Sequence, residues 1–180
     1  MVRETEANSQ RNVSETHPLL LAQYNALREE ILKRVELRYQ IVSLTLIVFG
    51  TTLSFGLQAH SSSTVLLYPI IALFLAASWI HNGFGIKEIG NYIRDQIEST
   101  VGEDIIGWEH RVRSQRKRLG GLGLSFLSAG GVFIGTSLLA ILTAVPLAKF
   151  DTIEILFFIL ATISLISSVV LLGYYRSSGK

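Results

Sequence analysis

The polar residues with the clearest capacity for chemistry lie at the end of a long apolar stretch. Trp79, His81 and Asn82 fall within four positions of one another, shortly before the charged Lys87. Histidine titrates near neutral pH, and polar groups at membrane depth are functional candidates. The three residues are therefore a candidate gate or proton-responsive latch. The simpler interpretation, which we favour, is an interfacial belt that places Trp79 among the lipid headgroups.

Five basic residues within eight consecutive positions precede another apolar stretch. Such a cluster suits an acidic ligand, such as a lipid headgroup, a nucleotide messenger or RNA. The simpler interpretation, again favoured, is a topology signal that rests on anionic lipid, with about 1 kcal/mol per basic residue. Aromatic residues do not interleave with the cluster, which counts against nucleic acid as a partner. The five residues are Arg111, Arg113, Arg116, Lys117 and Arg118.

The sequence carries no signature of an enzyme. Its cysteine count is 0, which excludes a disulfide framework and thiolate metal sites. It has no phosphate-binding glycine loop with a lysine, no potassium-filter motif and no nucleophile elbow. The interior of each apolar stretch is uncharged, so an ion-coupled transporter would lack its usual carrier group. We therefore expect neither enzymatic activity nor a bound cofactor or metal ion.

Small and hydroxyl-bearing residues mark helix faces within the apolar stretches. Gly131 and Gly135 form a GxxxG motif, whose small residues let two helix backbones approach closely. The partner helix is either another span of the same chain or a span of a neighbouring subunit, and both alternatives stay open. Thr45 and Thr52 either line a pore or bond to their own backbone, and we favour the second interpretation. The same alternatives apply to Ser164, Ser167 and Ser168.

The elements that position these residues follow from the distribution of charge. Of the 180 residues, 49% are hydrophobic and only 17% are charged, with a net charge of +2. Charged residues are missing from 39–86, 119–148 and 155–175. A soluble fold of this size cannot bury about 100 residues of nearly uncharged chain. The pattern therefore excludes an ordinary soluble domain, a disordered chain and a disulfide-stabilised secreted module.

We predict an all-α membrane protein with four transmembrane helices arranged as two hairpins and with cytoplasmic helical extensions. Each span needs about 20 mostly apolar residues, and the polar break at 60–63 divides the first run into two spans. Asp151 is the expected N-cap of the last span, with Glu154 at its third helical position. The predicted divisions are a flexible cytoplasmic N-terminus at 1–17, an amphipathic helix continuing into span 1 at 18–58, span 2 at 64–84, a cytoplasmic helical loop at 85–120, span 3 at 121–147, span 4 at 152–175 and a cytoplasmic tail at 176–180.

The basic residues predict the orientation of these spans. All but one of the 16 Lys and Arg residues lie before span 1, between spans 2 and 3, or in the tail. The exception is Lys149, between spans 3 and 4. Because basic residues are retained on the cytoplasmic side, we expect a protein integral to the cytoplasmic (inner) membrane, with both termini and the central loop in the cytoplasm.

An amphipathic helix precedes the first span. Leu20, Tyr24, Leu27 and Ile31 recur at spacings of three and four residues among charged side chains. This apolar stripe stands outside the bilayer and must be buried. It packs either on a second copy of the chain, which would make the four residues oligomerisation contacts, or on the stripe at 86–97 of the same chain.

Four short segments carry a resemblance to known proteins. They are Tyr24–Ile31 (YNALREEI), Leu67–Ile71 (LYPII), Ile89–Arg94 (IGNYIR) and Gly107–Glu109 (GWE). Together they look like a family of small bacterial integral membrane proteins without established function. The layout of a cytoplasmic helix, a tight two-span hairpin and a second cytoplasmic helix is similar to that of SLATT-type membrane effectors of bacterial conflict systems. That resemblance implies membrane disruption or pore formation after a defence signal, and it transfers no functional residues.

Two hypotheses of different classes follow. The first is a homo-oligomeric membrane effector or ion channel that is gated through its cytoplasmic helices. The alternative is a non-conducting membrane scaffold that recruits a soluble cytoplasmic protein through the same helices. The expected partners are the lipid bilayer, further copies of the chain, and a cytoplasmic protein or signal ligand. Nucleic acid is not expected.

Overall fold

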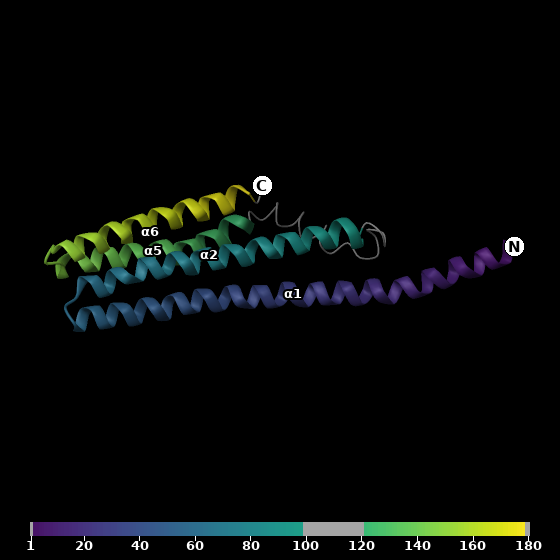
Figure 1. The fold of residues 1–180 in the computed structure, drawn as a ribbon, viewed down its shortest axis with the longest axis horizontal. Helices are drawn as coiled ribbons and strands as arrows, with labels where there is room; N and C mark the ends of the chain where they lie inside the picture. Colours follow the sequence, from purple (N-terminus) through teal and green to yellow (C-terminus); the bar gives the residue numbers. More distant parts are fainter. Residues whose placement is uncertain (1, 99–120, 179–180) are drawn as a thin grey trace.

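The protein is helical wherever its structure is described. The computed structural model describes the backbone of residues 2–98 and 121–178, and the side chains of 18–97 and 130–178 (Figure 1). No strand occurs in this part of the chain. Its elements are α1 (Val2–Gln58), α2 (Ser62–Tyr92), the π-helix η1 (Ile93–Glu98), α5 (Gly121–Ala144), the 3-10 helix η2 (Val145–Leu147) and α6 (Thr152–Ser177).

Four of the described helices are long and apolar enough to cross a membrane. This confirms the prediction of an all-helical membrane protein with four candidate spans. The segments that qualify are Pro18–Gln58, Ser62–Ile97, Gly130–Leu147 and Thr152–Ser177.

α1 begins earlier than the sequence analysis placed its start. We expected a flexible segment at 1–17, but the helix begins at Val2 and continues through Pro18 to Gln58. Residues 2–17 contain several good helix formers and no glycine, and one internal proline removes only one amide donor. In Figure 1, the N-terminal part of α1 extends well beyond the other helices.

A tight turn joins α1 to α2. His60 adopts a left-handed backbone with a φ of 48°, and this ends α1. The Ser61 amide then donates back to the Gly56 carbonyl at 2.9 Å, as in a Schellman motif. Ser61 caps α2, because its hydroxyl accepts from the Thr64 amide. A Cβ on Gly56 would collide with the Val65 side chain, so glycine permits the two helices to approach here.

α2 continues past its apolar core without interruption. Gly83, Gly85 and Gly90 do not end the helix, which reaches Tyr92 and passes into η1. Ile93 and Ile97 in η1 are fully buried. The Gln23 amide of α1 donates to the Tyr92 hydroxyl at 3.0 Å. The part of α1 around Gln23 and the part of α2 around Tyr92, which we call the extensions of the two helices, therefore lie side by side.

The turn between α5 and α6 differs in detail from the expected capping pattern. Asp151 is the N-cap of α6, but its side chain makes no capping hydrogen bond. Glu154 instead reaches back, and one of its carboxylate oxygens accepts from the Lys149 and Phe150 amides at 2.6 and 2.8 Å. The carboxylate therefore satisfies the free donors before the helix, which is half of the predicted capping box.

α2 lies at the centre of the bundle and packs against α1, α5 and α6 (Figure 1). Within their most apolar windows, 44% of α2 is buried but only 11% of α1. Small residues allow the close packing, since Ala72 and Ala76 of α2 and Ala161 of α6 are completely buried. α1 therefore presents most of its surface to the surroundings of the bundle.

Candidate functional site

Cationic and aromatic side chains from three helices meet near the C-terminal end of α6, which we call the tail end of the bundle. The Arg38 guanidinium lies 3.7 Å from the centroid of the Trp79 ring, and its Nε atom is fully buried. The Lys87 ammonium lies 3.9 Å from the Tyr175 ring centroid, and Phe84 contacts Tyr175 edge-on at 5.2 Å. We name Arg38, Trp79, Phe84, Lys87 and Tyr175 the cation–aromatic cluster. Cations desolvated over aromatic rings interact more strongly than exposed ones.

Two glycines of α2 and the C-terminal end of α6 determine how the side chains of this cluster pack. A Cβ on Gly83 would collide with the Tyr175 hydroxyl, and one on Gly85 would collide with the Arg34 guanidinium. The absence of side chains at both positions lets α2 accept these groups. Lys87 also donates to the backbone carbonyl of Tyr175 at 3.4 Å, where a positive charge complements the C-terminal end of α6. Arg34 in turn forms an ion pair with Glu30 at 2.6 Å.

The candidate gate residues do not converge on one point of α2. Trp79 is 5% exposed and contacts Tyr175 of α6 and Phe133 of α5 through ring edges at 5.7 and 6.3 Å. His81 is exposed, and Asn82 donates to the Ser78 carbonyl of its own helix at 3.1 Å. The structure therefore brings Trp79 together with Arg38 rather than with its two sequence neighbours.

The stripe that precedes the first span faces the interior of the chain. Leu20, Tyr24, Leu27 and Ile31 are half-buried, whereas Leu32, one position further along α1, is 68% exposed. The stripe lies on the side of α1 that contacts α2 and η1. Of the two alternatives, this placement favours packing within one chain.

The remaining predicted sites fall outside the packed interior. A Cβ on Gly131 or Gly135 would meet no atom within 4 Å, so the GxxxG face packs on none of the described helices. The basic residues Arg111, Arg113, Arg116, Lys117 and Arg118 lie outside the described residues.

Several hydroxyl groups inside the bundle bond to their own helices. Thr45, Ser137 and Ser168 each donate to the carbonyl four residues earlier, at 2.7 to 2.9 Å. The Tyr68 and Thr136 hydroxyls share a buried hydrogen bond of 2.6 Å between α2 and α5. Thr52 also donates to its own helix. For Thr45, Thr52 and Ser168, these contacts match the favoured interpretation of backbone-bonded hydroxyls.

A second polar contact joins the two turns at the opposite end of the bundle, which we call the turn end. The Ser62 hydroxyl, fully buried at the start of α2, donates to the Glu154 carboxylate of α6 at 2.6 Å. The other carboxylate oxygen accepts from the backbone amides before α6. This contact holds the α1–α2 turn and the α5–α6 turn together on one side of the bundle (Figure 1).

The outward face of α1 carries a row of polar residues that the sequence analysis missed. We name this row the polar seam. Its members are all exposed, and most of them lie about half a turn from the packed Thr45. Their recurrence at helical spacing through an otherwise apolar span is the sequence signal that would have revealed them. The polar seam consists of Glu36, Gln40, Ser43, Thr51, Ser54 and Gln58.

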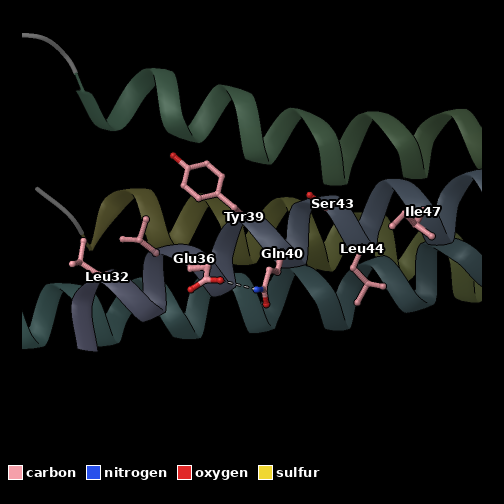
Figure 2. Close-up of a pocket in the computed structure, with 8 residues that line it drawn as sticks. Leu32, Glu36, Tyr39, Gln40, Ser43, Leu44 and Ile47 are labelled. Carbon is pink, nitrogen blue, oxygen red and sulfur yellow. Dashed lines mark hydrogen bonds between the residues drawn. The ribbon is translucent and has the colours of Figure 1, made fainter. Parts of the chain in front are cut away.

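A shallow groove of about 580 Å³ follows part of this face. Figure 2 shows its lining side chains along α1, with a hydrogen bond from Gln40 to Glu36 at 3.2 Å. Leu32, Tyr39, Leu44 and Ile47 line the same groove, so apolar side chains border the polar ones.

No protein family, curated protein or solved structure that we compared with this chain matches it. Among the residues that the structure describes, no group of three or more His, Asp or Glu side chains is placed to hold a metal ion.

Proposed function

We propose that this chain is a homo-oligomeric protein of the cytoplasmic membrane that forms pores or perturbs the bilayer, controlled through its cytoplasmic helices. The supporting observation is the cation–aromatic cluster. α1 and α2 pass through it as uninterrupted helices, and Tyr175 ties it to the end of α6. If the extensions of α1 and α2 move, the cation–aromatic cluster therefore transmits the movement to α1, α2 and α6 together.

In this proposal the four spans form two hairpins, with the tail end in the cytoplasm and the turn end outside. The contact between Ser62 and Glu154 supports a common side for both turns. The basic residues support the direction, because all but Lys149 lie in segments that would then be cytoplasmic. The extensions of α1 and α2, joined by Gln23 and Tyr92, would project from the bilayer as the signal-receiving part.

One observation favours a different function, that of a non-conducting scaffold which recruits a soluble cytoplasmic partner. The hydroxyls of Thr45, Ser137 and Ser168 inside the bundle are bonded to their own backbone rather than aligned along a polar route. If the protein conducts, the route therefore lies between copies of the chain.

Ion flux from vesicles separates the two functions. We expect the purified full chain, reconstituted in vesicles of mixed neutral and anionic lipid, to release entrapped potassium. Arg38→Gln should change the rate severalfold, because it removes the charge that lies over Trp79. Lys33→Gln, an exposed position on the same helix, is the matched control and should leave the rate unchanged. Vesicles that hold inserted protein and release no potassium would favour the scaffold.

A further inference from the structure

We propose that the polar seam of α1 is the surface through which two copies of this chain pair, α1 against α1, within the membrane. The inference rests on the proposed function in that it takes the chain as a membrane-spanning oligomer. It names the surface and the partner, and it differs from the stripe at Leu20–Ile31, which the fold uses internally.

Contact between the polar seam and lipid hydrocarbon is unfavourable. Ser43, Thr51 and Ser54 lie inside the charge-free run and are exposed on the bundle. Polar side chains within a membrane face other helices or water rather than hydrocarbon. Thr51 donates to the Ile47 carbonyl at 2.9 Å, and Gln58 donates to the Ser54 hydroxyl at 2.9 Å. Glutamine and serine have more donors and acceptors than these bonds use.

A second copy of the chain supplies the missing partners. Gln, Ser and Thr side chains both donate and accept, so two identical seams are complementary to each other. Because basic residues are retained on the cytoplasmic side, all copies insert in the same direction and their α1 helices are parallel. A twofold axis along the membrane normal then places each seam residue near the same residue of the second copy.

The shape of α1 permits the approach. Gly50 and Ser54 form a small-xxx-small pair on the outward face, the pattern that lets membrane helices pack closely. A Cβ on Gly50 would meet no atom within 4 Å, so the fold of one chain does not require this glycine. The groove that contains Gln40 and Ser43 offers a recess for side chains of the second helix.

The GxxxG face of α5 provides a weaker case. Gly131 and Gly135 have equal space around them, but the exposed neighbours Leu138, Leu139 and Leu142 are apolar. Lipid chains can cover such a face without leaving a polar group unsatisfied.

Single-cysteine crosslinking tests the pairing directly, because the chain has no cysteine of its own. We expect Ser43→Cys and Ser54→Cys to give a disulfide-linked dimer when the full chain in lipid vesicles is oxidised. Thr162→Cys on α6 is also exposed and is the matched control, which should stay monomeric. Absence of a dimer at both seam positions, or equal dimer at Thr162, would overturn the proposal and leave the seam to lipid or to another protein.

A second variant tests the close approach of the helices. Gly50→Leu has room within one chain but would separate two seams, so we expect the dimer fraction of the Ser54→Cys protein to fall about tenfold. Gly173→Leu, at an equally open glycine of α6, should leave that fraction unchanged. An unchanged dimer in Gly50→Leu would contradict the seam as the contact.

Potassium flux measured on the same vesicles separates this inference from the proposed function. Seam crosslinks without flux would support the pairing and reject the pore. Flux without seam crosslinks would support the pore and reject the pairing.

Discussion

Trp79 joins three helices through a single side chain. The Arg38 guanidinium of α1 covers the face of its ring, and ring-edge contacts reach Phe133 of α5 and Tyr175 of α6. An interfacial belt residue would point toward lipid headgroups, but this ring is buried in the bundle. At the residue scale, an aromatic ring with a cation over it therefore connects the helices at the tail end.

Replacement of Trp79 tests how much its side chain contributes to the stability of the bundle. We expect Trp79→Ala to lower the free energy of unfolding in detergent by about 3–5 kcal/mol, because it leaves a cavity and exposes Arg38. Phe74→Ala on the same helix removes a ring that is 68% exposed and should cost far less. Thermal melts followed by circular dichroism compare the two variants, and equal losses would contradict a packing role for Trp79.

The two faces of α1 differ in what they contact. Its inward face carries Thr45 and Arg38 and packs on α2. Its outward face carries the polar seam and the groove. The same division continues toward the N-terminus, where Leu27 is half-buried and Leu21 is 58% exposed. At the element scale, one helix thus serves both the interior of the chain and its surface.

The inward stripe should govern stability rather than assembly. We expect Leu27→Asp to lower the melting temperature, because it places a charge between α1 and the extension of α2. The oligomer mass in detergent should stay the same. Leu21→Asp, at an exposed position, should change neither quantity. Light scattering together with thermal melts measures both. A smaller oligomer in Leu27→Asp, with an unchanged melting temperature, would place a subunit contact at the stripe instead.

The whole molecule has two unlike ends. At the turn end, Ser62 and Glu154 bind the two short connections to each other. At the tail end, Arg38 and Lys87 place positive charges over the rings of Trp79 and Tyr175. Basic side chains at one end and few at the other suit a fixed orientation in a charged membrane.

Topology reporters test this orientation. A reporter that is active only outside the cytoplasm should work when inserted after His60, an exposed residue of the turn. The same reporter fused after Lys180 should be inactive, because the proposed orientation places that end with the basic residues in the cytoplasm. A cytoplasmic reporter at both positions should give the reciprocal result. The opposite pattern of activities would reverse the proposed orientation.

The number of long apolar helices could be predicted from the sequence because it depends on local properties. Long uncharged runs and the polar break at 60–63 mark these helices, and α1 ends at Gln58 while α6 begins at Thr152. The start of α1 could not be predicted so well, because residues 2–17 carry no periodic apolar pattern.

Only the tertiary structure decided which face of each helix packs. Thr45 turns inward and Ser43 outward, and Trp79 joins Arg38 while His81 stays exposed. In a soluble protein, apolar residues identify the buried face because the other face must meet water. In a membrane both faces of a span are apolar, since lipid is as apolar as the protein interior. Composition alone therefore leaves the packed face undetermined, and the contacts with α2 select it.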